Sequence, residues 1–219
     1  MYNVVITGAS CGIGLATAIK FIEQGYKVYG IDIQPCYDEG LKCNLNYIHV
    51  IEDVRKPWFD IDDVNILINN AGVQNSDDDI GVNLEGVINC TEKYGLQPSI
   101  HSIVNLASVS GHNGAEFGRY TASKGGVLSY TVWTAKQIAK YGATCNSISA
   151  GGVITELNAP VLSDQAKWAA IMNETPLKKW ATAREIADWI YFLTTVNKSM
   201  SGQDLIIDNL ETYNHNFIW

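Results

Sequence analysis

The 219-residue sequence predicts an α/β fold in which helices cover both faces of one doubly wound parallel sheet, in three α/β/α layers. Two observations carry this prediction. Strand-like apolar runs alternate with helix-like segments along the whole chain, which is typical of parallel strands joined by right-handed crossovers. The runs VNILIN and HSIVNL are apolar almost throughout, as expected of strands that are covered on both faces.

The expected elements follow one another in a regular order, and one connection is unusual. Only the stretch RKPWFDIDD separates the third strand from the fourth, which is too short for a crossover helix. We therefore expect a turn or a short 3₁₀ segment there. The strands are predicted at 3–7, 27–33, 47–51, 64–69, 102–106, 144–149 and 204–207, and the helices at 13–24, 80–94, 120–141 and 183–193.

Length and composition indicate one domain over residues 1–219, with no repeat or linker. Hydrophobic residues make up 47% of the chain and charged residues 17%, a balance typical of globular proteins. The formal net charge of −8 argues against a nucleic-acid partner and against a polybasic membrane contact. No apolar run approaches a membrane span and no leader precedes the first strand, so we expect a cytoplasmic location.

The five cysteines are scattered and form no C-x-x-C pair or Cys/His cluster. The sequence therefore predicts reduced thiols and no metal site.

The first strand is followed by a glycine-rich loop, TGASCGIG, with glycines at positions 8, 12 and 14. Small residues let the backbone approach a pyrophosphate, and the following helix supplies N–H donors at its N-terminus. This predicts a Rossmann-type nucleotide site, although a tight turn alone would give a similar pattern.

Asp32 ends the second strand, 18 residues after Gly14. A carboxylate there can accept hydrogen bonds from the ribose hydroxyls of the adenosine half and would repel a 2′-phosphate. Cys11 stands at the loop position where an arginine would otherwise hold that phosphate. Both observations favour NAD over NADP, with a solvated loop acid as the alternative for Asp32.

Tyr120 and Lys124 lie four residues apart, so they share one face of the predicted helix. An ammonium group beside a phenol lowers the tyrosine pKa from about 10 and prepares it to exchange a proton with a carbonyl or an alcohol. Ser108 follows the fifth strand, at the edge where ligands bind, and can orient a substrate oxygen. Taken singly, a solvated Tyr/Lys pair and a loop-capping serine are the alternatives. Asn83 lies inside a predicted helix and can bend it or hold a water.

Together these motifs resemble the short-chain dehydrogenase/reductase family over nearly the whole chain, and most of all its 3-oxoacyl-acyl-carrier-protein-reductase-like members. TGASCGIG is similar to the cofactor loop, NNAG at 69–72 to a strand-stabilising motif, and PLKKWATAREIA at 176–187 to the C-terminal part of these members. The resemblance implies a catalytic tetrad of Asn83, Ser108, Tyr120 and Lys124. It implies a cofactor site formed by Gly8, Ser10, Cys11, Gly12, Ile13, Gly14, Asp32, Asp53, Asn70, Ala71, Gly72, Tyr120, Lys124, Gly151, Val153 and Thr155.

The roles implied by the resemblance are specific. Tyr120 is the general acid/base, Lys124 assists it and holds the nicotinamide ribose, and Ser108 positions the substrate oxygen. Asn83 holds a water of a proton relay through Lys124. Thr155 contacts the nicotinamide carboxamide. Asp53 contacts the adenine ring.

The sequence also departs from the family pattern. Ala150 replaces the usual proline before Gly151 and Gly152, so a more flexible loop is expected. Asn209-Leu210 replaces a usual Gly-Gly, and the stretch at 73–80 is short. Two functions therefore stay open: an NAD-dependent oxidoreductase acting on a secondary alcohol or a ketone, and a weakly active or inactive nucleotide-binding sensor or scaffold.

Three further expectations concern the periphery. Residues 153–180 resemble a substrate lid, in which Trp168 lines the pocket or packs internally. The acidic run at 77–79 is expected to be a solvated turn. The aromatic tail at 211–219 is expected to pack on a neighbouring subunit of a homodimer or homotetramer.

Overall fold

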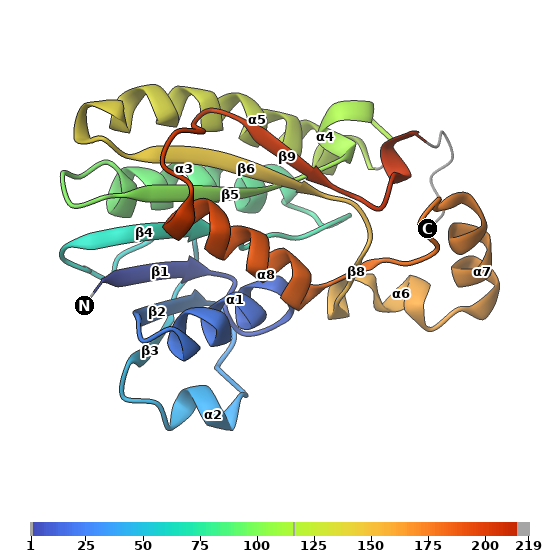
Figure 1. The fold of residues 1–219 in the computed structure, drawn as a ribbon. Helices are drawn as coiled ribbons and strands as arrows, with labels where there is room; N and C mark the ends of the chain where they lie inside the picture. Colours follow the sequence, from blue (N-terminus) through green and yellow to red (C-terminus); the bar gives the residue numbers. More distant parts are fainter. Residues whose placement is uncertain (1, 116, 214–219) are drawn as a thin grey trace.

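The computed structural model describes residues 2–115 and 117–213, and its central feature is a seven-stranded sheet in which all the strands are parallel (Figure 1). The strand order is β3-β2-β1-β4-β5-β6-β9, so the chain winds outward in both directions from β1 and β4. The strands are β1 (Asn3–Thr7), β2 (Lys27–Asp32), β3 (Tyr47–Ile51), β4 (Val64–Asn69), β5 (Ser102–Ser108), β6 (Thr144–Ala150) and β9 (Asp204–Ile207). The predicted Rossmann-type α/β/α fold is confirmed.

Helices pack on both faces of the sheet because successive strand residues point to opposite sides. On β1, Val4 and Ile6 join one core cluster with helices α1 (Gly12–Glu23) and α8 (Ala183–Tyr191), while Val5 joins the other. The second cluster includes residues of α3 (Gly86–Cys90) and α5 (Gly118–Ile138), and Figure 1 shows the two helix layers on either side of the sheet.

The predicted elements are present within a few residues, but several short ones were missed. The helix expected at 80–94 is a continuous helical run in which π-helical turns at Gly81–Glu85 and Thr91–Gly95 flank α3. The missed elements are α2 (Glu39–Lys42), α4 (Ser110–Asn113), α6 (Ala159–Leu162), α7 (Gln165–Glu174) and a small parallel sheet of β7 (Val153–Ile154) and β8 (Ala181–Thr182). Residues 214–219, most of the aromatic tail, lie outside the described residues.

The connection between β3 and β4 contains no helix, as its length predicts, and one buried carboxylate organises it. Glu52 is 3% exposed. Its Oε1 accepts hydrogen bonds from the backbone N–H groups of Trp58 (2.5 Å) and Phe59 (2.6 Å), and its Oε2 accepts one from the Tyr94 hydroxyl (3.1 Å). The carboxylate thus satisfies backbone donors that a crossover helix would have paired internally.

This arrangement predicts a large cost for removing the acceptor. In Glu52→Met the side chain keeps its approximate size but leaves two backbone donors and a hydroxyl without this partner. We expect the free energy of unfolding to fall by about 3 kcal/mol, measured by urea denaturation followed by circular dichroism. Glu52→Gln keeps one acceptor oxygen and is the matched control, which should lose less than half as much. Equal stability of the two variants would contradict this role.

Candidate active site

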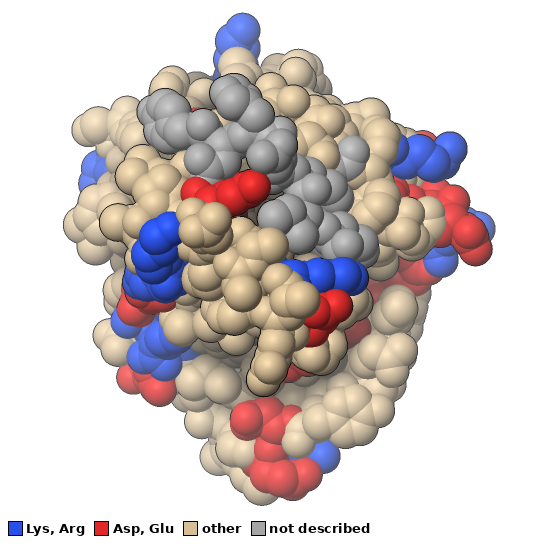
Figure 2. All heavy atoms as spheres, turned by 90° about the vertical axis from the view of Figure 1, so that its right-hand side faces the viewer, with Lys and Arg blue, Asp and Glu red and all other residues tan. Residues whose placement is uncertain are grey.

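A cavity of about 640 Å³ lies at the carboxyl edge of the sheet, where the segments that follow all seven strands of the main sheet come together. This is the edge at which ligands bind in open parallel sheets, and the volume suits a small-molecule ligand. Figure 2 looks onto this edge, where the surface is hollowed and acidic side chains lie around the hollow. Among the described residues no group of three or more His, Cys, Asp or Glu side chains forms a potential metal site.

The glycine-rich loop is held in one conformation by close backbone packing. A Cβ atom on Gly14 would lie 1.9 Å from the carbonyl oxygen of Gly8, so α1 starts directly against the end of β1. Gly8 and Gly12 have φ values of +66° and +53°, which glycine adopts without strain. No side chain caps the N-terminus of α1, so its first N–H groups stay available to an anionic ligand beside the loop.

The NNAG motif ties the end of β4 to this loop. The side-chain amide of Asn70 donates to the carbonyl oxygens of Thr7 and Gly8, both at 3.0 Å. The backbone N–H groups of Asn70 and Ala71 donate to the Thr7 hydroxyl, also at 3.0 Å. The two loops therefore form one rigid wall of the cavity.

Asp32 also belongs to this wall and is more than a solvated loop acid. Its Oδ2 accepts the Ser10 backbone N–H (2.9 Å), and its Oδ1 accepts that of Gln34 (2.9 Å). The carboxylate is therefore fixed at the rim of the cavity, which it lines. A carboxylate accepts several hydrogen bonds, so each oxygen still has room for a hydroxyl donor.

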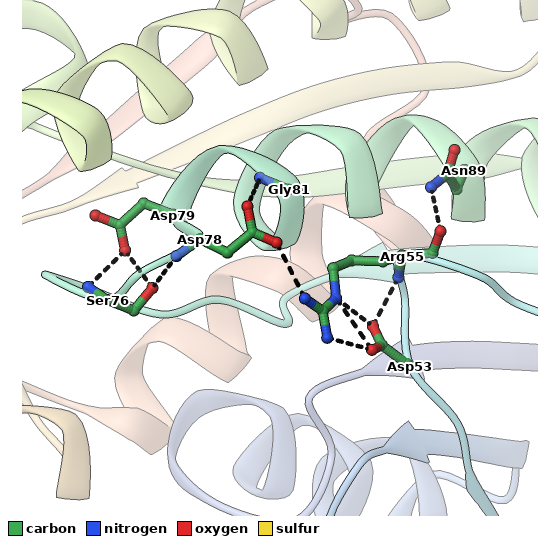
Figure 3. Close-up of polar contacts among 7 residues, drawn as sticks. All are labelled: Asp53, Arg55, Ser76, Asp78, Asp79, Gly81 and Asn89. Carbon is green, nitrogen blue, oxygen red and sulfur yellow. Dashed lines mark hydrogen bonds and ion pairs between the residues drawn. The ribbon is translucent and has the colours of Figure 1, made fainter.

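Asp53 lines the cavity too, but it is engaged with a residue that the sequence analysis did not single out. Arg55 donates four hydrogen bonds to it, one from the backbone N–H and three from the guanidinium group, of which the shortest is 2.6 Å from Nη2 to Oδ2 (Figure 3). These hydrogen bonds hold the pKa of the Asp53 carboxyl below its usual range. Arg55 also contacts Asp78 at 3.0 Å, so it connects Asp53 to the segment before Asn83.

The acidic run at 77–79 is not simply a solvated turn, which corrects the expectation. Asp78 accepts the backbone N–H of Gly81 (3.1 Å) and so caps the start of the helical run that carries Asn83 (Figure 3). Asp79 is 1% exposed and accepts the backbone N–H (3.0 Å) and the hydroxyl (2.7 Å) of Ser76. The Asp78 cap pairs one of the first N–H groups of the helical run, and Asp79 fixes the turn that precedes it.

Three of the four predicted catalytic residues line the cavity together. Ser108, Tyr120 and Lys124 are 4%, 9% and 5% exposed. The Lys124 Nζ donates to the carbonyl oxygen of Leu106 (2.8 Å) and lies 5.7 Å from the centre of the Tyr120 ring. The Ser108 Oγ accepts hydrogen bonds from the hydroxyl (3.0 Å) and the backbone N–H (3.2 Å) of Ser110.

Asn83 lies behind this group rather than on the cavity wall. It is fully buried in the first π-helical turn. Its amide exchanges hydrogen bonds with the backbone of Val73 (2.8 and 2.9 Å) and donates to the Ser123 hydroxyl (3.0 Å). Ser123 in turn donates to the carbonyl oxygen of Tyr120 (2.6 Å), so Asn83 connects the loop after β4 to the helix of the tyrosine.

The loop after β6 is not the flexible segment that its two glycines suggested. A Cβ on Gly152 would lie 2.0 Å from the Trp180 ring, and one on Gly151 would lie 2.3 Å from the Glu211 carboxylate. The glycines therefore allow close packing. Trp168 packs edge-on against Trp180, with ring centres 5.2 Å apart, and is not a lining residue.

Most of the predicted site residues thus meet at one cavity. Ser10, Gly14 and Asn83 stand directly behind its wall. The predicted site residues that line the cavity are Gly8, Cys11, Gly12, Ile13, Asp32, Asp53, Asn70, Ala71, Gly72, Ser108, Tyr120, Lys124, Gly151, Val153 and Thr155. The sequence analysis missed Arg55, Ser110, Trp180 and Glu211, which also line the cavity. Of these, only Ser110 could have been found from its position in the sequence, because it lies two residues after Ser108 and can reach its hydroxyl.

The close packing of Gly14 gives a prediction about the glycine-rich loop. In Gly14→Ala the new methyl group meets the carbonyl of Gly8, and backbone must move to relieve it. We expect the free energy of unfolding to fall by more than about 2 kcal/mol and binding of ADP-ribose to be lost.

The matched control is Gly25→Ala. Gly25 has φ +79° but no atom within 4 Å of its added Cβ, so only backbone strain is introduced. It should lose about 1 kcal/mol and keep its binding. Denaturant unfolding and calorimetric titration give both quantities, and a Gly14→Ala protein that binds like the Gly25→Ala protein would refute the assignment.

The comparisons with known proteins indicate the family to which the chain belongs. A family model described as enoyl-(acyl carrier protein) reductase matches residues 46–209. The 3-oxoacyl-[acyl-carrier-protein] reductase FabG of Thermotoga maritima is 31% identical, over 93% of this chain and 95% of that protein.

Two solved structures are similar over their whole length. A 4-hydroxyisoleucine dehydrogenase mutant complexed with NADH and succinate has a TM-score of 0.88 and 26% identity, covering 98% of this chain and 100% of that one. ElxO with NADP bound has a TM-score of 0.83 and 25% identity, covering 97% and 98%. The match over well over half of the sequence, together with the site geometry, shows that the chain belongs to the short-chain dehydrogenase/reductase family.

Proposed function

We propose that this protein is an NAD-dependent oxidoreductase that interconverts a secondary alcohol and a ketone. One observation carries the proposal: Ser108, Tyr120 and Lys124 are buried side by side on the wall of a cavity that continues to the glycine-rich loop. Membership of an oxidoreductase family supports the reaction class. A hydride passes to or from the nicotinamide ring when the cofactor is bound.

The residues divide the remaining work among them. Ser108 donates to the substrate oxygen and orients it, and Ser110 fixes the Ser108 hydroxyl from behind. Tyr120 gives a proton to the ketone oxygen or takes one from the alcohol, and the Lys124 ammonium favours its phenolate form. Asn83 acts as a positioning residue, because its amide is used by Val73 and Ser123.

The preference for NAD is argued from this chain's own residues, since the similar structures hold NADH in one case and NADP in the other. The fixed carboxylate of Asp32 accepts ribose hydroxyls and repels a 2′-phosphate. Among the described lining residues, Arg55 and Lys124 are the only Lys or Arg side chains. Arg55 is paired with Asp53 and Asp78, and Lys124 lies on the Tyr120 side.

The alternative function is a nucleotide-binding sensor or scaffold without catalysis, and the trimmed connection between β3 and β4 favours it. The burial of Ser108, Tyr120 and Lys124, which the chemistry needs, argues against this alternative.

A homo-oligomeric state and a cytoplasmic location stay predictions. In the part of the chain that the structure describes, no helix has the length and apolarity of a membrane span.

The test compares cofactor binding with turnover. Wild type should bind NADH at least tenfold more tightly than NADPH, and Asp32→Ala should remove most of this preference, because the repulsion is lost. On a panel of ketones and secondary alcohols, Tyr120→Phe should lower kcat by more than about 100-fold while NADH binding is kept. Binding without Tyr120-dependent turnover would support the sensor or scaffold, and a preference for NADPH would overturn the assignment of the cofactor.

A further inference from the structure

Glu211 reaches the cavity from an unusual direction, because it follows the last strand of the sheet instead of lying in the lid or in a loop near Tyr120. The chain leaves β9 through Asp208 and turns sharply, and Glu211 then contacts the loop that follows β6. It lines the same cavity as Tyr120 and Thr155.

The turn that delivers it is held in a conformation that its residues rarely adopt. Asn209 and Leu210 have φ values of +52° and +72°, where the family pattern has two glycines. The Asp208 carboxylate compensates: Oδ1 accepts the Leu210 N–H (3.0 Å), and Oδ2 accepts the N–H (2.6 Å) and the hydroxyl of Thr212. Backbone strain of this kind persists where surrounding contacts over-determine it, often near functional sites.

The Glu211 carboxylate gathers donors from two other segments. Its Oε2 accepts the backbone N–H of Gly152 at 2.6 Å. Its Oε1 accepts the indole N–H of Trp180 and lies 3.4 Å from the Thr175 hydroxyl, which makes a shorter hydrogen bond to the carbonyl oxygen of Ile171 (2.9 Å). Trp180 itself lies on Gly152, so one carboxylate connects the loop after β6 to the end of the lid segment.

The environment of Glu211 makes these contacts more than a surface pairing. Burial raises the pKa of the Glu211 carboxyl, while the hydrogen bonds from Gly152 and Trp180 act in the opposite direction. A charge in such surroundings interacts strongly with the donors that face it. The loop it holds lacks the family's proline, so the carboxylate supplies the restraint that the proline ring would otherwise give.

We propose that Glu211 is a positioning residue for the nicotinamide half of the site, which fixes the loop from Gly151 to Thr155 through Gly152 and Trp180. The inference rests on the proposed function, because it assigns the role of that loop toward the nicotinamide. It adds a residue from the segment after β9, the last strand, to a site otherwise built from the loops that follow β1 to β6.

The experiment compares two ligands that differ at the nicotinamide. NADH carries the nicotinamide and ADP-ribose lacks it, and both occupy the glycine-rich loop. In Glu211→Gln an amide N–H₂ must face the donors of Gly152 or Trp180. We expect this variant to bind NADH about tenfold more weakly, the effect of losing one charged hydrogen bond, and ADP-ribose within twofold of wild type in calorimetric titrations.

Two further variants separate positioning from general stability. Glu39→Gln removes a glutamate that pairs with Lys42 in α2 and does not line the cavity, and should leave both affinities unchanged. Trp180→Phe removes the indole donor together with part of the ring that packs on Gly152 and Trp168, and should weaken NADH binding by at least threefold. Combined with Glu211→Gln it should add little, because the two side chains act through one contact.

The outcomes distinguish the two proposals. Equal loss of NADH and ADP-ribose affinity in Glu211→Gln, or no loss of either, overturns the role of Glu211 and leaves the proposed function intact. Failure of the wild type to bind either ligand overturns the proposed function, and the role of Glu211 with it. If Glu211→Gln does not fold, Trp180→Phe carries the same comparison, and hydrogen exchange at the Gly152 amide of this variant reports whether Glu211 still accepts that N–H.

Discussion

The contact between Gly14 and the carbonyl of Gly8 is the constraint on which the rest of the site depends. It brings α1 against the end of β1 with no room for a side chain, so the first N–H groups of the helix face the cavity. Asn70 then fastens the end of β4 to the same carbonyl. Because β4 neighbours β5, this also sets the position of Ser108 relative to the glycine-rich loop.

Three carboxylates replace structure that the short chain lacks. Glu52 satisfies the donors of a connection without a helix, Asp78 starts the Asn83 helix from a segment of only a few residues, and Glu211 restrains a loop without its proline. In each case a side chain supplies acceptors to backbone N–H groups that regular structure would have satisfied. Charged acceptors suit this role because their hydrogen bonds are stronger than neutral ones.

The fold and the centre of the site were predictable because their signals are local. The alternation of apolar runs with helix-like segments predicted all seven strands of the main sheet. The four-residue spacing of Tyr120 and Lys124 predicted that both lie on one helix face. The small sheet of β7 and β8 was missed because two-residue strands carry no periodicity. The pairing of Arg55 with Asp78 and the approach of Glu211 to Gly152 were missed because they join segments 23 and 59 positions apart. The two glycines at 151 and 152 were misjudged for the same reason: their neighbours come from distant parts of the chain.

The position of β9 has a consequence for synthesis. In the strand order β5-β6-β9, the last strand closes the edge of the sheet and is made after every other strand. A growing chain can therefore contain the glycine-rich loop and the Tyr120 helix while Glu211, the acceptor for the Gly152 amide, is still missing. Because β9 pairs with β6, β6 has an open edge in any partly folded chain in which residues 204–211 are not yet in place. Completion of the sheet and completion of the cavity wall are then the same folding event.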